Sequence, residues 1–231
     1  MSASLLAFQG VTLRYQADAP AVLEGISLGL APGERVALLG LNGSGKTTLL
    51  KAAVGLLPFE GRIQVFGETL GHATLEGIRS RVGYLFNQPE DQLLFPEVLD
   101  DVAFGLRRKG VPLAEARDRA RASLAALGVE GLAGKEVHHL SHGQKQRVAL
   151  AGALVTGPEL LLLDEPSAAL DPPGREHLAA LLRQLGAAML IATHDLDFAR
   201  ACCTRALLIR DGRIFPCAGI GADVFEPDLP G

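Results

Sequence analysis

The sequence contains few cysteines: three among 231 residues, at Cys202, Cys203 and Cys217. This set offers neither a disulfide framework nor the paired spacings of a zinc site. Disulfides are rare where thiols are kept reduced, so the cysteine usage favours an intracellular compartment. The fold must then depend on a buried core, and 48% of the residues are apolar, which is ample for one.

The sequence also lacks an excess of basic charge. It carries 22 Lys and Arg against 26 Asp and Glu, a formal net charge of −4, so we expect no nucleic-acid partner. The N-terminal stretch lacks both the charged start and the long apolar run of a signal peptide. No other apolar run reaches the roughly 20 residues that span a bilayer. We therefore expect any role at a membrane to be peripheral.

Short strands and helices alternate along the chain, with Pro and Gly between them. Helical spacing of apolar residues occurs at 46–55, 97–110 and 113–128. The run ELLLLDEP is apolar without alternation, which is typical of a strand buried on both faces of a mainly parallel sheet. The predicted strands are residues 5–15, 21–31, 35–40, 61–67, 81–86, 159–166, 188–195 and 205–212.

No internal repeat or linker divides the chain, so the sequence predicts one α/β domain over residues 1–231. We interpret the helical stretch 89–156 as an insertion into that domain. Residues 1–88 and 157–231 would then form the remainder.

The segment GLNGSGKTT fits the phosphate-binding motif G-x-x-x-x-G-K-[ST], and it lies between a predicted strand and a predicted helix. Its backbone N–H groups would cradle phosphate oxygens, Lys46 would neutralise the β- and γ-phosphates, and the Thr47 hydroxyl would ligate Mg²⁺. The alternative is a glycine-rich turn that matches by chance. The predicted nucleotide-binding residues are Gly40, Leu41, Asn42, Gly43, Ser44, Gly45, Lys46, Thr47 and Thr48.

Polar residues follow two of the later strands, where open α/β sheets place their ligands. Asp164 would hold Mg²⁺, and Glu165 would orient or deprotonate the water that attacks the γ-phosphoryl group. The alternative for this pair is helix capping. His194 could reach the γ-phosphate and the same water, although a single His after a strand is more often structural.

The segments GLNGSGKTT, LSHGQ, LLLLDEP, SAALD and IATHD occur in this order, and with them the chain resembles the nucleotide-binding subunit of ATP-binding cassette (ABC) transporters over essentially its whole length. The resemblance implies a P-loop core with a mainly parallel sheet, a small antiparallel β-subdomain and an inserted helical subdomain. It also implies ATP and Mg²⁺ as ligands.

Further site residues are implied by the resemblance alone. Tyr15, predicted at the end of a strand, would stack on adenine; the alternative is an ordinary strand tyrosine. Ser141, Gly143 and Gln144 would face the γ-phosphate bound by a second subunit, although S-x-x-Q is also a capping box. Asp171 would cross to that subunit, and it also stands where a helix N-cap would.

Two positions depart from the family's pattern. His142 occupies a position where the family usually has Gly, which a helix start tolerates because the side chain can point outward. Asn87 precedes Gln88, whereas the family usually has Gln at the first of these positions. Asn87 would reach roughly 1.5 Å less far towards Mg²⁺ and the attacking water. We therefore expect slower or more partner-dependent hydrolysis, unless Gln88 substitutes.

The runs PEDQL, VLDDVAFG, GQKQRVALAGAL and ATHDLDFARACC resemble the ATPases of energy-coupling factor (ECF) importers, especially those for cobalt and nickel. The resemblance implies two ATPase subunits at the cytoplasmic face of the membrane, an integral membrane coupling protein and a membrane substrate-binding component. Because all the motifs are present on this one chain, we expect the two ATPase subunits to form a homodimer. A groove at residues 87–104 would receive a helix of the coupling protein.

Other interpretations remain open at this point. The importer could carry biotin or another vitamin, or the chain could be a soluble ABC ATPase that acts as an assembly factor. A metabolic P-loop kinase fits less well, because kinases have no LSHGQ-like segment. We interpret His138, His139 and His142 as isolated, solvated side chains, since no carboxylate shares their spacing.

Overall fold

The computed structural model describes residues 4–16 and 18–221, so the predicted domain ends at 1 and 231 lie outside the described residues. Its main sheet has six strands in the order β10-β9-β3-β8-β7-β6, and all neighbours are parallel except β10 with β9. The strands are β3 (Arg35–Leu39), β6 (Val82–Leu85), β7 (Leu160–Asp164), β8 (Ala188–Thr193), β9 (Arg205–Arg210) and β10 (Arg213–Pro216).

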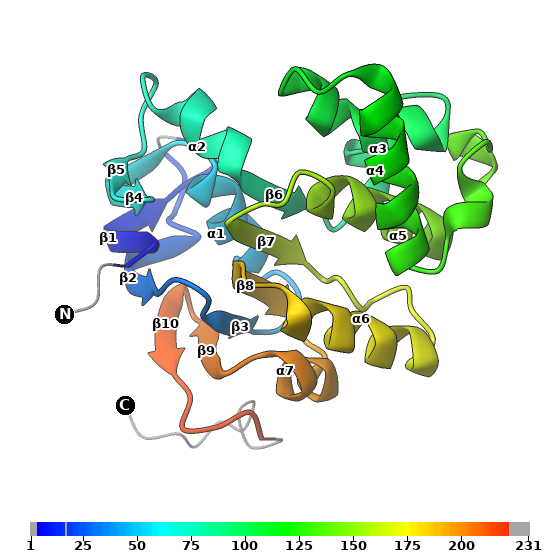
Figure 1. The fold of residues 1–231 in the computed structure, drawn as a ribbon. Helices are drawn as coiled ribbons and strands as arrows, with labels where there is room; N and C mark the ends of the chain where they lie inside the picture. Colours follow the sequence, from blue (N-terminus) through cyan, green and yellow to red (C-terminus); the bar gives the residue numbers. More distant parts are fainter. Residues whose placement is uncertain (1–3, 17, 222–231) are drawn as a thin grey trace.

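A second, four-stranded sheet is antiparallel throughout, in the order β2-β1-β4-β5. Its strands are β1 (Leu6–Leu13), β2 (Leu23–Leu30), β4 (Phe59–Val65) and β5 (Glu68–Thr69). The α/β fold with a mainly parallel sheet and a smaller antiparallel one is therefore confirmed (Figure 1).

Helices cover the main sheet, and α3, α4 and α5 lie together beyond the β6 edge (Figure 1). No helix of residues 4–16 and 18–221 is long and apolar enough to cross a membrane. The helices are α1 (Lys46–Ala53), α2 (Leu75–Arg81), α3 (Val98–Arg108), α4 (Leu113–Ala126), α5 (His142–Leu154), α6 (Pro172–Gln184) and α7 (Leu196–Cys202). Short 3₁₀ turns lie at η1 (Pro89–Asp91), η2 (Glu130–Leu132) and η3 (Val137–His139).

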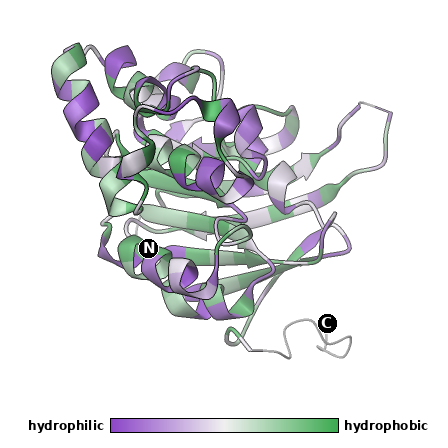
Figure 2. Ribbon diagram, turned by 90° about the vertical axis from the view of Figure 1, so that its right-hand side faces the viewer, coloured by the Kyte–Doolittle hydropathy of each residue, from purple (hydrophilic) through white to green (hydrophobic). Residues whose placement is uncertain are grey.

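Strand β7 is buried on both faces, as its unbroken apolar run predicts. Leu161 and Leu163 pack into one core cluster with α3, α4, α5 and α6, whereas Leu160 and Leu162 pack into another with α1 and the antiparallel sheet. The inserted helices thus share a core with one face of the main sheet. Figure 2 shows the mainly apolar strands lying between helices that alternate apolar and hydrophilic residues.

The predicted helices and strands are all present, with bounds shifted by a few residues. Four elements went unpredicted, namely α2, α7, β5 and β10, because two to seven residues carry too little periodicity to be recognised. One placement was wrong: Tyr15 lies in a bend two residues after β1, not within a strand.

Candidate functional site

The P-loop, residues 40–45, connects the end of β3 to the start of α1, and two of its glycines are required by space. Gly45 has a left-handed φ of 105°, and a Cβ there would lie 2.8 Å from a Leu23 methyl group. A Cβ on Gly40 would lie 2.9 Å from the Ile209 carbonyl oxygen. A side chain at either position would force the loop away from the sheet edge.

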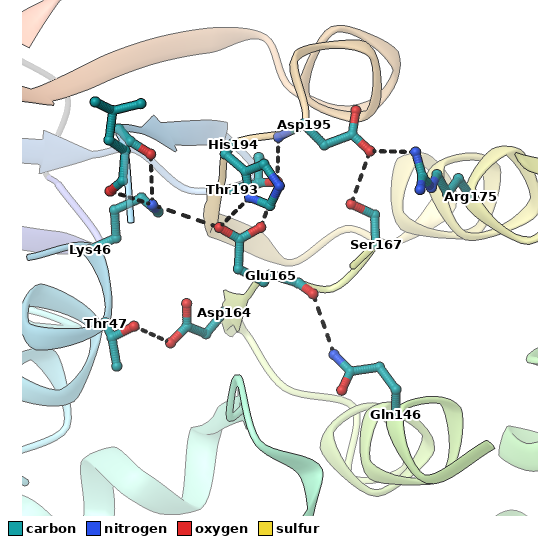
Figure 3. Close-up of polar contacts among 12 residues, drawn as sticks. Lys46, Thr47, Gln146, Asp164, Glu165, Ser167, Arg175, Thr193, His194 and Asp195 are labelled. Atoms are coloured by element: carbon teal, nitrogen blue, oxygen red, sulfur yellow. Dashed lines mark hydrogen bonds and ion pairs between the residues drawn. The ribbon is translucent and has the colours of Figure 1, made fainter. Parts of the chain in front are cut away.

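Lys46 is only 6% exposed, and its ammonium group is held by the loop that precedes it. Its Nζ donates hydrogen bonds to the carbonyl oxygens of Gly40, at 2.7 Å, and Leu41, at 3.2 Å. The carboxylate of Glu165 lies 3.7 Å away, so the buried charge is paired as well as hydrogen-bonded (Figure 3). A bound phosphate group would replace these neutral carbonyl oxygens as the hydrogen-bond acceptor of the Lys46 ammonium group.

Asp164 ends β7 and faces the first turn of α1. The Thr47 hydroxyl donates to Asp164 Oδ2 at 2.6 Å, whereas Oδ1 is buried without a hydrogen-bond partner among the described residues. Burial raises the pKa of this carboxyl above its usual value and the neighbouring Glu165 adds to the effect, against the opposing hydrogen bond from Thr47. A divalent cation would favour the ionised form, and these hard oxygen donors fit Mg²⁺.

Glu165 is 7% exposed and has an unusual left-handed φ of 50°. Its N–H donates to the Ala192 carbonyl at 2.8 Å, and its carboxylate Oε1 lies 3.0 Å from His194 Nδ1. Gln146 of α5 donates to its carbonyl oxygen at 3.4 Å, and Thr193 donates to its Oε2 at 3.1 Å (Figure 3). Residues in such strained conformations persist where their surroundings fix them from several sides.

One cavity of about 590 Å³ is lined by Lys46, Thr47, Asp164, Glu165 and His194, and we call it the P-loop cavity. Two further predicted residues lie on it: Tyr15, which is 62% exposed and whose hydroxyl is 2.9 Å from Thr48 Oγ1, and Asn87. Gly40, Leu41 and Gln88 do not line it. Its lining is Tyr15, Val22, Asn42, Gly43, Ser44, Gly45, Lys46, Thr47, Thr48, Asn87, Asp164, Glu165, Ala168 and His194.

The loop that carries Asn87 is bonded to α5 at two points. Gln92 accepts a hydrogen bond from the Phe86 N–H at 3.2 Å and donates to the Ala149 carbonyl at 2.7 Å. Lys145 of α5 lies 2.9 Å from the Glu90 carboxylate. The position of this loop is therefore fixed relative to α5.

Ser141 is the N-cap of α5, and the capping box predicted as the alternative is confirmed. The Gln144 N–H donates to Ser141 Oγ at 3.4 Å, and the Ser141 N–H donates to Gln144 Oε1 at 3.0 Å. The helix begins at His142, directly after this cap.

Gly143 and Asp171 both make local contacts outside the P-loop cavity. A Cβ on Gly143 would lie 2.8 Å from the Ala169 carbonyl oxygen, so this position packs against the segment that leads to α6. Asp171 accepts from the Gly174 N–H at 3.3 Å, which confirms its predicted N-cap role. Neither residue lines the P-loop cavity, and nor do Ser141 and Gln144.

One expectation about histidines was wrong. His138 and His139 are not isolated, because the 3₁₀ turn η3 places their rings 4.0 Å apart. The Glu136 carboxylate lies 3.3 Å from His138 Nε2 and 3.6 Å from His139 Nδ1. His142 similarly lies 3.8 Å from Glu90. All these side chains are about half exposed or more, so water competes with each contact.

Sequence reasoning missed the residues that hold Glu165 and its neighbours. Thr193 and Gln146 contact Glu165 directly, and Asp195 accepts hydrogen bonds from Ser167 and Arg175, both at 3.3 Å. Two signals were available: Thr193 is a polar residue at the end of an apolar strand, and Gln146 is a buried amide on α5.

The capping box generates a test of Ser141 in the nucleotide-free protein. Ser141→Ala should lower the free energy of unfolding by about 1 kcal/mol, because the Gln144 N–H loses its acceptor. Ser141→Asp keeps an accepting oxygen at a helix start that favours negative charge, so it should stay within about 0.5 kcal/mol of the parent. Urea denaturation measures both variants, and equal losses would show that Ser141 is not a cap.

Comparisons with known proteins show the family to which the chain belongs. Residues 23–168 match the family model described as ABC transporter. The energy-coupling factor transporter ATP-binding protein EcfA of Methanocaldococcus jannaschii is 41% identical over 215 residues, which cover 90% of this chain and 77% of that protein.

Two solved structures share the fold. The structure of cbiO1 from Clostridium perfringens, described as part of the ABC transporter complex cbiONQ, has a TM-score of 0.79 and 36% identity, and the match covers 92% of this chain and 87% of that one. A dimer of the ATP-binding cassette MJ0796 in a post-hydrolysis state with ADP and Pi has a TM-score of 0.84 and 30% identity, covering 93% and 99% of the two chains. With these matches, and with its P-loop, Asp164 and Glu165 gathered at one cavity, the chain belongs to the ABC transporter family as one of its ATP-binding subunits.

Proposed function

We propose that this ATPase works as a dimer of two copies and energises a membrane importer of the ECF type. ATP hydrolysis itself follows from membership of the family. The observation that carries the dimer is the lining of the P-loop cavity: it includes Lys46 and Glu165, whereas Ser141 and Gly143 lie elsewhere on the same chain. A second copy can bring its own Ser141 loop to the ATP, and the cassette structures that this chain resembles are dimeric.

Each side chain around the P-loop cavity would have a separate role in ATP hydrolysis. Lys46 would leave the carbonyls of Gly40 and Leu41 to bind the β- and γ-phosphates. Glu165 would take a proton from the water as the water oxygen attacks the γ-phosphorus and the bond to the bridging oxygen breaks. His194 and Asn87 line the same cavity and would orient the water and the γ-phosphate.

Thr47 and Asp164 would hold Mg²⁺, the ion that neutralises charge on the transferred phosphoryl group when it is bound. The fit rests on the unpartnered, buried Oδ1 of Asp164 and on the hydroxyl of Thr47 beside it. Both are hard oxygen donors, which Mg²⁺ prefers.

Two exposed apolar side chains support a partner at residues 87–104. Leu94 is 71% exposed, and Phe95 is partly exposed and stacks on Phe104 at 4.9 Å between ring centroids. The Asp101 carboxylate accepts hydrogen bonds from the N–H groups of Leu94 and Phe95, so this apolar loop is held in place. A helix of an integral coupling protein would cover it.

The relatives support an assembly at a membrane, since EcfA is an energy-coupling factor transporter protein and cbiO1 is part of a transporter complex. We propose the same for this chain, at the cytoplasmic face of the membrane, with a substrate-binding component that recognises cobalt or nickel. A biotin importer would use the same kind of ATPase. Transport of labelled metal or vitamin by cells that carry the full complex would distinguish a metal importer from a biotin importer.

The dimer proposal predicts that Glu165→Gln traps an ATP-bound dimer. The substitution keeps the binding residues and removes the proton acceptor, so turnover should fall by about a hundredfold or more while ATP still binds. Size-exclusion chromatography with Mg-ATP should show the dimer. Adding Ser141→Asp should abolish that dimer, because a carboxylate would face the γ-phosphate; a monomer in Glu165→Gln alone, at high protein concentration, would contradict the proposal.

The short side chain at Asn87 generates a second prediction. Asn87→Gln should raise the ATPase rate several-fold, because the longer side chain reaches roughly 1.5 Å further into the cavity that Asn87 lines. Gln88→Ala serves as the control, since Gln88 is exposed and does not line the cavity. An unchanged rate in Asn87→Gln would remove the idea that the Asn slows hydrolysis.

The partner surface is tested with Leu94→Asp in membranes that contain the whole complex. Co-purification of integral membrane proteins should fall at least about tenfold, because a charge would be buried in the interface, while ATP binding stays at the parent level. Leu113→Asp, at another partly exposed leucine of the inserted helices, is the matched control. Capture of no membrane protein even by the parent would favour the role of a soluble assembly factor.

A further inference from the structure

Thr193 is the last residue of β8, and its side chain is completely buried beside Glu165. The two residues come from neighbouring parallel strands: Asp164 pairs with Ala192, and the next residues along, Glu165 and Thr193, leave the sheet at the same edge. The Thr193 hydroxyl lies 3.1 Å from Glu165 Oε2 (Figure 3). This contact is not part of the chemistry described above.

The direction of that hydrogen bond is set by the carboxylate, whose oxygens can only accept, and a second hydrogen bond agrees with it. The Asp195 backbone N–H donates to Thr193 Oγ1 at 3.0 Å, and an N–H group can only donate. The hydroxyl thus acts as the acceptor there, and its single proton points to Glu165 Oε2. A hydroxyl that donates to a carboxylate oxygen fixes the orientation of the carboxylate.

The two oxygens of the Glu165 carboxylate consequently differ. Oε2 is engaged by Thr193, whereas Oε1 accepts no hydrogen bond from the described residues and lies 3.7 Å from Lys46 Nζ and 3.0 Å from His194 Nδ1. Both of these side chains line the P-loop cavity. Oε1 is therefore the oxygen on the side of Lys46 and His194, the two residues that it shares with the P-loop cavity.

The Thr193 hydroxyl is itself held in place by the segment that follows it. Asp195, which supplies the N–H, caps α7 through the Phe198 N–H at 2.9 Å and accepts from Ser167 and Arg175 at 3.3 Å. The Glu165 backbone is similarly fixed by the Ala192 carbonyl. Both partners of the Thr193–Glu165 hydrogen bond are therefore held by backbone groups of neighbouring segments.

We propose that Thr193 is a positioning residue for hydrolysis: it anchors Oε2 of Glu165 so that Oε1 is presented to the attacking water. The inference rests on the proposed role of Glu165 as the group that takes the proton of that water. Thr193 itself touches neither ATP nor the water, so its removal should affect the rate of hydrolysis and leave ATP binding intact.

Two matched pairs of variants separate the hydroxyl from the bulk of the side chain. Thr193→Val keeps the shape and removes the hydroxyl, and Thr193→Ser keeps the hydroxyl and removes a methyl group. In the full-length protein kcat should fall about tenfold or more in Thr193→Val, with KM for ATP changed less than about twofold, whereas Thr193→Ser should stay within about threefold of the parent. Thr193→Ala, which differs from Thr193→Ser only by the oxygen, should repeat the loss if the Val variant does not fold.

Two controls complete the experiment. Thr204→Val also removes a hydroxyl that donates to a carbonyl, that of Arg35 at 3.1 Å, but far from Glu165, and it should leave kcat unchanged. In single-turnover measurements, adding Thr193→Val to Glu165→Gln should lower the residual rate less than about twofold, because a residue that acts through Glu165 has nothing left to position.

Each outcome decides the matter. A normal kcat in Thr193→Val, an equal loss in Thr193→Ser, a raised KM with normal kcat, or full additivity with Glu165→Gln would overturn the positioning role. Normal hydrolysis in Glu165→Gln would instead show that the proposed role of Glu165 is wrong. The two failures are thus distinguishable.

Discussion

The parallel pairing of β3, β8 and β7 is the constraint on which the rest of the molecule depends. Leu39 pairs with Thr193, and Asp164 pairs with Ala192, so three strands end level with one another. Each strand is apolar up to that point because helices or the second sheet cover both faces. Polar residues begin where the strands are no longer covered on both faces. The P-loop, two carboxylates and a histidine therefore lie together at the carboxyl edge of the main sheet.

Burial at this edge makes the charges interdependent. Lys46, Asp164 and Glu165 are nearly inaccessible to water, and an unpaired charge there would cost several kcal/mol. Each is compensated by groups within reach: carbonyls and a carboxylate for Lys46, a hydroxyl for Asp164, and a hydroxyl and an ammonium for Glu165. The left-handed backbone of Glu165 is tolerated because the Ala192 carbonyl and the Gln146 side chain hold it.

The sequence predicted what depends on local pattern. The P-loop, the apolar run of β7 and the two helix caps at Ser141 and Asp171 each carry their signal within a few residues. It could not predict Thr193 as a neighbour of Glu165, because strand register joins positions 28 residues apart. The pairing of Glu136 with two histidines was missed for a related reason, since a 3₁₀ turn has no periodic pattern.

Helix α5 is bonded at both its sides to parts of the molecule that do different work. Gln92 and Lys145 fasten the loop that carries Leu94 and Phe95 to it, and Gln146 reaches from it to the backbone of Glu165. A partner that displaced that loop would therefore act on α5 within about one helical turn of Gln146, and so on the backbone that carries Glu165. Contact at the loop and proton transfer at Glu165 would then be linked through a single helix.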